Sequence, residues 1–528
     1  MKKRKKIILG SITGALALAL AGGGFWAYKT FVPQETPIDK NATVASNFYQ
    51  AVNKDWLLKA KIPADSPSID NFYTLDEDIK GKLKKDIKNL GEGKETSDIT
   101  GMSEFITFYK AASDYKQREK DGLEPLKPYL KEIEDIKDLN DLASKSASLT
   151  DKGIPLPFGY NVGTNAENTS QKQIQLSPPS ILLPDVSIYK DEASKKQYLT
   201  PIETATQKAL EMLGYSEKNS KRIVKEALEF DEIIAKYSLS NEEMSESKNL
   251  VHPKTAEEIN AYSGSFKLYD VIKGIMGRDL ETINVPNTKY FENYSKIVNQ
   301  DNFSKIKSWI LVQEAMAASN SLTEDYRLNF ASISMAIMGT QKPISKEDTV
   351  YEMSVNLFSD VMSVYYGRKY FGEEAKTDVT GMIDKIKNVY RGRLQQNDWL
   401  TEGTRNKAIE KLDKMKVFVG YQEDVDPGTK ELHLDPNKSF FELSEDIAQF
   451  GKRYTIDHFD DPIDKNKWSG SAFDINAYYN PESNSINFPA GILQAPFYDK
   501  NQSTEKNYGG IGVVIGHEIT HAFDSNGA

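Results

Sequence analysis

No cysteine occurs anywhere in the 528-residue sequence. Disulfide bonds, thiolate metal sites and a lipid anchor on cysteine are therefore excluded. A chain without these supports must be held together by its hydrophobic core, and a chain of this length buries enough apolar surface to do so. With 39% hydrophobic and 27% charged residues, the composition is that of a globular protein. We expect two or more folded units.

The first thirty residues have the pattern of a membrane-targeting element. Five basic residues at positions 2–6 precede an uncharged run from Ile7 to Tyr28, which is long enough to cross about 30 Å of hydrocarbon. Positive charge before the span predicts that most of the chain lies outside the cytoplasm. We therefore predict that residues 1–32 form a cytoplasmic stub and a signal anchor that crosses the cell membrane once. Residues 33–43 are predicted to form a stalk. The alternative is a cleaved signal peptide and a secreted chain, because A-x-A-like sites occur at 17–21.

The net charge is −10 at pH 7. Nucleic-acid binding needs a basic surface, so we expect no nucleic-acid partner.

Residues 44–470 mostly have the apolar periodicity of helices. Thr200 followed by Pro201 predicts a helix start, and Gly214 predicts the end of that helix. We predict further helices near 220–238, 348–371 and 377–394. The segment 154–183 differs, because its prolines exclude a helix and Gln173–Leu176 alternates like a short strand.

The last sixty residues have a different pattern, with strand-like segments followed by one helix. The segment Asn476–Phe488 contains two short alternating runs around turn-forming residues, and we predict a β-hairpin whose outer strand faces a cleft. A helix is expected from Gly509-Gly510 to about Asp524. Its apolar stripe should be buried against elements that follow the helix; it comprises Ile511, Val514, Ile515 and Ile519.

That helix contains His517, Glu518 and His521 in the order His-Glu-x-x-His. Histidines four residues apart lie on one helical face, so both imidazoles can reach one Zn²⁺ at about 2.0–2.1 Å. Glu518 lies beside them and can take a proton from a water that the metal activates. Two unrelated histidines on a surface helix would give the same spacing. The other three histidines lie in polar or loop contexts, and we expect them to be surface residues (His252, His433 and His458).

The surrounding residues resemble the neprilysin family of zinc endopeptidases, which includes bacterial oligopeptidases. The resemblance is carried by VVIGHEITHAFD at 513–524, NAYYNP at 476–481 and FPAGILQAPFY at 488–498. NFYQAVNKDW at 47–56 is similar to the start of the family's folded part. The absence of cysteine departs from the disulfide-bonded animal members and favours a bacterial type.

The resemblance implies a role for each matching residue. His517 and His521 would be ligands of one Zn²⁺, and Glu518 would be the general base. Asn476 would hydrogen-bond the backbone of an oligopeptide substrate through its amide, with Ala477 offering its carbonyl; an exposed edge strand could accept an extended peptide in this way. Asp524 would either orient a ligand histidine from the second shell or end the helix.

Two histidines are too few for a catalytic zinc ion, which is usually coordinated by three protein ligands and a water. Similar enzymes take the third from a Glu on a later helix, and no such motif precedes Ala528. We therefore expect a C-terminally truncated family member with an incomplete zinc site, which a separate C-terminal chain could complete.

The fold implied by the resemblance is mainly α and two-lobed. A helical cap lobe would take most of 44–470, and a thermolysin-like catalytic lobe with a small β element would begin at 471–528. The implied activity is endopeptidase cleavage of oligopeptides at the amino side of apolar residues. Two alternatives stay open, namely a catalytically inactive surface protein that binds peptides or host proteins, and the poorly folding product of a broken reading frame.

Overall fold

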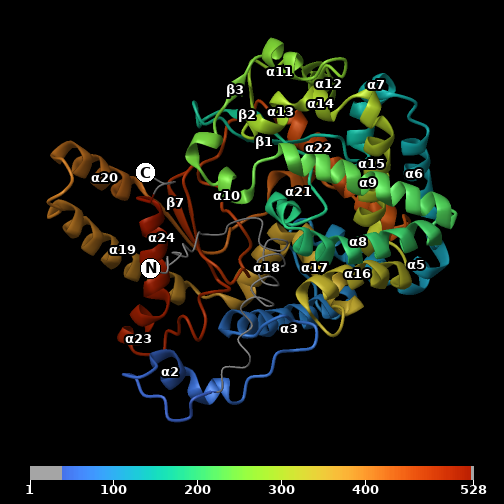
Figure 1. Cartoon of the computed structure of the whole chain (residues 1–528). Helices are drawn as coiled ribbons and strands as arrows, with labels where there is room; N and C mark the ends of the chain where they lie inside the picture. The colour runs from blue at the N-terminus through green and yellow to red at the C-terminus, as the bar shows by residue number, and fades with distance from the viewer. Residues whose placement is uncertain (1–37, 525–528) are drawn as a thin grey trace.

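The fold is that of a computed structural model, which describes residues 38–524. The described chain is mainly helical, as predicted, and its strands form two small sheets (Figure 1). The predicted membrane span Ile7–Tyr28 lies outside the described residues. Between residues 38 and 524, no helix combines the length and apolarity needed to cross a membrane.

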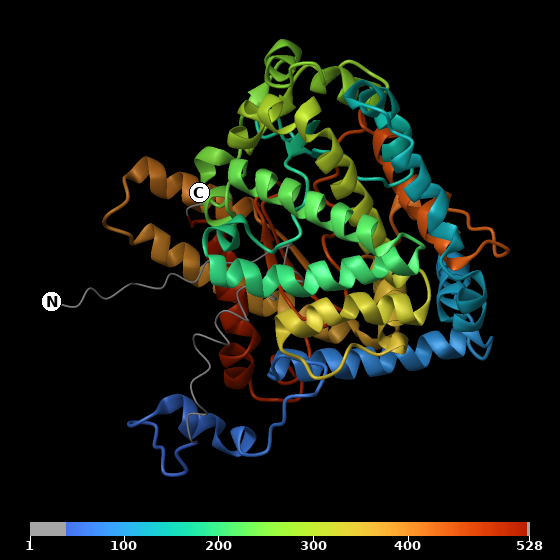
Figure 2. The ribbon, with the colours of Figure 1, turned by 45° about the vertical axis from the view of Figure 1, so that its right-hand side comes forward.

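A large helical core fills one side of the molecule (Figures 1 and 2). The long helices α8, α9, α15 and α16 pack together at its centre. Its helices are α6 (Lys127–Glu134), α7 (Leu139–Asp151), α8 (Glu192–Met212), α9 (Glu217–Tyr237), α11 (Ala256–Tyr262), α12 (Leu268–Met276), α13 (Thr288–Glu292), α14 (Tyr294–Ile297), α15 (Phe303–Ala317) and α16 (Glu324–Met338). The short helix α10 (Asn241–Met244) has no buried residue.

A four-stranded sheet in the order β1-β2-β4-β3 belongs to the same core. Its strands are β1 (Gly159–Thr164), β2 (Lys172–Ser177), β3 (Pro253–Lys254) and β4 (Ile283–Asn284). The predicted strand Gln173–Leu176 is confirmed as β2, which pairs with β1 as an antiparallel hairpin.

A middle core joins the N-terminal helices to later ones. Its helices are α3 (Asn71–Gly91), α4 (Met102–Ser113), α17 (Lys346–Leu357), α18 (Ser359–Tyr370) and α22 (Phe440–Asp457). The short helix α21 (Pro427–Glu431) lies between Val425 and Leu432, which are both buried in this core. Two other short helices lie outside this set, α2 (Phe48–Leu57) and α5 (Tyr115–Asp121).

The C-terminal core carries the predicted site. Its three-stranded sheet has the order β5-β7-β6, with β7 central and β6 at an edge. The elements of this core are α19 (Glu373–Gln395), α20 (Glu402–Lys414), β5 (Lys416–Gly420), β6 (Tyr478–Asn480), β7 (Ser485–Pro489), α23 (Thr504–Gly509) and α24 (Ile511–His521). The core thus combines residues from both sides of position 470, and the boundary predicted there stays a prediction.

Two local predictions were wrong. The helix predicted to start at Thr200 begins at Glu192, because Asp191 caps it through a hydrogen bond from the Ser194 N–H, and Pro201 lies inside it. The segment predicted as one helix over 348–371 is two, α17 and α18, divided at Phe358. The predicted end at Gly214 is confirmed, since this glycine has a φ of +97°.

Candidate metal centre on helix α24

Helix α24 is fixed by its apolar face. Ile511, Ile515 and Ile519 are fully buried in the C-terminal core, where the helix packs on α19 and β6. Three of the four predicted stripe residues are therefore buried by elements that precede the helix in sequence, and Val514 is partly buried against the same core. The expectation that these isoleucines need later elements to cover them is wrong. The helix begins after Gly510, its N-cap, where an added Cβ would lie 2.3 Å from the Phe497 carbonyl oxygen.

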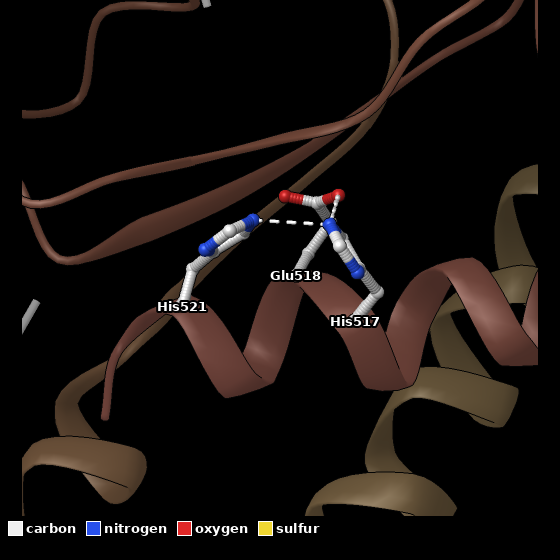
Figure 3. A group of neighbouring side chains, drawn as sticks. All are labelled: His517, Glu518 and His521. Carbon is white, nitrogen blue, oxygen red and sulfur yellow. Dashed lines mark hydrogen bonds and ion pairs between the residues drawn. The ribbon is translucent and has the colours of Figure 1, made fainter. Parts of the chain in front are cut away.

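The opposite face presents the two histidines. The His517 side chain is 63% exposed and that of His521 is 25% exposed. Their Nε2 atoms lie 3.0 Å apart, so the two imidazoles point toward one another (Figure 3). Glu518 lies between them, with Oε1 3.9 Å from the His517 Nε2.

The donor set fits a zinc ion. Two imidazole nitrogens at tetrahedral positions around Zn²⁺ lie about 3.3 Å apart, close to the separation of the two Nε2 atoms. Ligand atoms of His517, Glu518 and His521 all lie within 4.8 Å of one another. In the described part of the chain, this is the one group of three or more histidine, cysteine or acidic residues that could hold a metal.

Glu518 is buried, unlike its histidine neighbours. Burial raises the pKa of its carboxyl to about 7, while His521 and a hydrogen bond from the backbone of Tyr479 oppose the rise. Tyr479 is the middle residue of β6, so the edge strand lies directly beside Glu518. The carboxylate is thus held between the helix that bears the histidines and the strand predicted to bind substrate.

Asp524 lies beside the second histidine. Its Oδ2 is 2.7 Å from the Nδ1 of His521, so the Nε2 of His521 is left to face His517. Lys411 of α20 lies close to this pair. Burial lowers the pKa of Lys411, and the negative charge of Asp524 opposes this shift. The Lys411 Nζ also lies 5.9 Å from the centre of the Tyr479 ring.

The predicted hairpin is confirmed. Strand β6 pairs antiparallel with β7 through Tyr478–Asn487 and Asn480–Ser485, and Asn484 takes a positive φ of 48° in the turn. Asparagine tolerates this conformation better than most residues. Asn476, two residues before β6, is exposed, and Ala477 is buried in the same core as the α24 isoleucines.

Sequence reasoning missed Tyr479 and Lys411 as neighbours of the site. Tyr479 acts through its backbone, which leaves no signature in residue type. Lys411 comes from a helix more than a hundred positions earlier in the chain, and only the packing of α20 brings it there. The remaining histidines lie outside the site, and His458 stacks on Tyr454 with ring centres 3.9 Å apart.

Comparison with known proteins gives one consistent family. Profiles described as "Peptidase family M13" match residues 44–422 and 476–528. A neutral endopeptidase of Lactobacillus helveticus is 35% identical over 491 residues, covering 93% of this chain and 76% of the relative. A neutral endopeptidase of Lactococcus lactis is 33% identical over 490 residues, covering 92% and 77%.

Solved structures agree with this result. PepO from Lactobacillus rhamnosis superposes with a TM-score of 0.88 at 27% identity, covering 92% of this chain and 77% of that one. The zinc metalloprotease Zmp1 of Mycobacterium tuberculosis, in complex with an inhibitor, gives 0.83 at 24% identity, covering 93% and 74%. The chain thus spans about three quarters of the length of these relatives.

Proposed function

The chain belongs to peptidase family M13, a family of zinc metalloendopeptidases, and we propose that its site on α24 hydrolyses oligopeptides at the amino side of apolar residues. One observation carries the proposal, namely the convergence of His517, Glu518 and His521 beside an edge strand.

Each residue of the site has a proposed part. His517 and His521 would hold one Zn²⁺ through their Nε2 atoms. When bound, the metal supplies Lewis acidity, which polarises a carbonyl and lowers the pKa of water. Glu518 would accept the proton of the attacking water and return it to the leaving amine. Asp524 would hold the tautomer of His521 through Nδ1.

Substrate would bind by adding a strand to β6. An edge strand offers backbone hydrogen-bonding groups to an extended peptide, and β6 is at the edge of its sheet. The Asn476 amide and the Ala477 carbonyl would bind the peptide backbone. Because the Tyr479 backbone reaches Glu518, a peptide on this edge would pass beside the proposed base.

The third zinc ligand would come from outside the described residues. Within 38–524 the metal cluster has two imidazoles and Glu518, and we assign Glu518 to proton transfer. A further polypeptide segment, which a separate chain could supply, would complete the site. Peptide binding without hydrolysis is a second candidate function, favoured by the edge strand β6 beside the site.

We also propose that the folded bulk lies outside the cytoplasm on a single N-terminal anchor, with secretion after signal cleavage as the alternative. Protease treatment of intact cells would remove the bulk and leave a membrane-bound stub. A mature form in the medium beginning near Gly22 would favour the secreted alternative.

The direct test of the activity uses zinc-loaded protein and a quenched-fluorescence peptide with one apolar residue. We expect the chain, together with any completing segment, to cleave before that residue. Glu518→Gln should lower kcat by about 10²- to 10⁴-fold, the usual contribution of a general base, without loss of bound zinc. Cleavage that persists in the Glu518→Gln protein would overturn the assignment.

A further inference from the structure

Asn484, in the β6–β7 turn, uses both polar atoms of its side chain. Its Nδ2 donates a hydrogen bond to the Lys411 carbonyl oxygen of α20 at 2.9 Å, and its Oδ1 accepts one from the Tyr479 hydroxyl at 3.1 Å. Its backbone carbonyl accepts a third from the Lys416 N–H, at the start of β5, at 2.9 Å. One residue therefore ties the turn to β6, α20 and β5.

Tyr479 connects this turn with the site. It is the middle residue of edge strand β6, and its backbone hydrogen-bonds to the Glu518 carboxylate. We propose that Asn484 is a positioning residue, which holds the Tyr479 side chain and thereby fixes both the peptide-binding edge of β6 and the carboxylate of Glu518. This inference rests on the proposed function.

Strand β6 has few other contacts that could hold it in place. It has three residues and pairs with β7 along one edge. Its other edge must stay unpaired if a peptide is to add there. A strand this short, held along one edge, depends on its side-chain contacts for a fixed position.

The ring of Tyr479 is also held by Lys411. The Lys411 Nζ lies 5.9 Å from the ring centre, within the range of a cation–π contact. Burial, and then the negative charge of Asp524, raise the pKa of Tyr479 to about 12, so the hydroxyl keeps its proton and remains the donor to Asn484. One lysine therefore contacts the ring with its ammonium group and the Asn484 amide with its carbonyl.

The backbone of Asn484 offers a different explanation for this residue. Its φ of +48° is one that asparagine tolerates and that glycine adopts at no steric cost. If Asn484 served only the turn, glycine would replace it without loss. If its side chain positions Tyr479, glycine would keep the turn and release the ring.

Peptide binding to the Glu518→Gln protein, which should not cleave its ligand, separates these two explanations. We expect Asn484→Gly to weaken the binding of a labelled octapeptide by about two- to tenfold, because the peptide must then also order β6 and one hydrogen bond makes a net contribution of this size. Zinc affinity, measured by competition with a coloured chelator, should stay within about twofold of the parent, because both histidines stand on α24. Unchanged peptide affinity would overturn the positioning role, and so would an equal loss of zinc affinity, which would mean that the whole site is disturbed.

A double-mutant cycle tests whether the effect passes through Tyr479. Tyr479→Phe removes the hydroxyl that Asn484 accepts, so it should weaken peptide binding about as much as Asn484→Gly, and the double variant should bind no more weakly than either. Tyr478→Phe is the matched control on the same strand, because the Tyr478 hydroxyl donates to the Ser469 carbonyl instead. Its effect should multiply with that of Asn484→Gly. Multiplying effects for Tyr479→Phe would overturn the proposed path.

The octapeptide also distinguishes this inference from the proposed function. If the Glu518→Gln parent binds no octapeptide, the proposed function fails and the positioning role fails with it. If the parent binds and Asn484→Gly binds equally well, the positioning role fails alone. Hydrogen–deuterium exchange over 477–480 needs no peptide, and it should be faster in Asn484→Gly and in Tyr479→Phe than in the parent. Unchanged exchange in both variants would show that Asn484 does not hold β6.

Discussion

The imidazole of His521 is held between two groups, because its Nδ1 faces Asp524 Oδ2 at 2.7 Å and its Nε2 faces His517 at 3.0 Å. A carboxylate on one nitrogen fixes the tautomer that offers the other nitrogen to a metal. We therefore expect Asp524→Ala to weaken zinc binding by about 10- to 100-fold, the usual cost of losing such a partner.

Competition with a coloured chelator measures this affinity directly. Asp461→Asn changes an exposed carboxylate in the loop after α22 and serves as the control. An Asp524→Ala protein that binds zinc as tightly as the control would show that Asp524 only ends the helix.

At the residue scale, the sequence predicts those contacts that join residues close together along the chain. The proximity of His517 and His521 follows from helical periodicity alone, whereas Asp524 lies in the turn after α24. The neighbours contributed by β6 and α20 could not be predicted, because the approach of Tyr479 and Lys411 depends on how separate elements pack.

Among the elements, the edge strand β6 and the residues before it determine how a peptide would be held. Asn476 is exposed, so its replacement should cost little stability. We expect Asn476→Ala to weaken peptide binding by about tenfold, consistent with the loss of one hydrogen bond in a bound complex, and to leave zinc binding intact.

The binding constant of a non-cleaved peptide to the Glu518→Gln protein provides the measurement. Asn437→Ala, at an exposed asparagine in the loop before α22, is the matched control. If Asn476→Ala and Asn437→Ala bind the peptide equally well, Asn476 has no part in substrate binding.

The interface between α15 and α22 contains a buried ionisable group remote from the metal ligands in sequence. Burial, and then the negative charge of Glu445, raise the pKa of Glu314 to about 7, while Lys452 opposes the rise. The folded-state pKa thus lies above the unfolded value, so the carboxyl is protonated in the folded protein at pH 5. Stability should fall as the pH rises from about 4.5 to about 7, because ionisation then favours the unfolded chain.

Glu314→Gln removes this ionisation. We expect the variant to be more stable than the parent at pH 8 by an amount of the order of 2 kcal/mol, and to gain little at pH 5. Thermal unfolding of both proteins at the two pH values checks the difference. The exposed helical Glu203→Gln should show no such dependence, and a gain for Glu314→Gln of equal size at both pH values would contradict the assignment.

Element prediction succeeded where local signals agreed and failed where they competed. Alternation, turn residues and prolines all indicated the β6–β7 hairpin, which formed as predicted. At Thr200-Pro201 the local start signal was strong, but Asp191 caps the same helix two turns earlier and the buried Tyr198 packs in the large core. Tertiary packing therefore kept the helix continuous through the proline.

On the scale of the whole molecule, the helix that bears the site, α24, belongs to the C-terminal core, apart from the large core. Figures 1 and 2 place α2, α19, α20, α23 and α24 on one side of the molecule. These elements carry several exposed apolar side chains, which are Phe48, Tyr49 and Val52 on α2, Val389 on α19, Trp399 before α20 and Val513 on α24. Exposed apolar side chains of this size offer surface that a further polypeptide could cover.

A family-type C-terminal piece, expressed separately, should therefore restore what the described residues lack. Zinc-loaded residues 33–528 alone should cleave a quenched peptide slowly or not at all, because the described residues offer the metal two imidazoles and we assign Glu518 to proton transfer. Activity should appear when the piece is added. Trp399, which is 77% exposed, should shift its fluorescence to shorter wavelength as its surroundings become apolar.

Two variants separate docking from catalysis in this experiment. Trp399→Phe should remove the spectral shift and identify its source, whereas Glu518→Gln should keep the shift and lose the activity. A spectral shift without activity would mean that the piece docks but supplies no working ligand. Residues 33–528 could instead be fully active without the piece and lose that activity in the Glu518→Gln protein. That result would show that residues 33–528 supply every ligand that the zinc ion needs for catalysis.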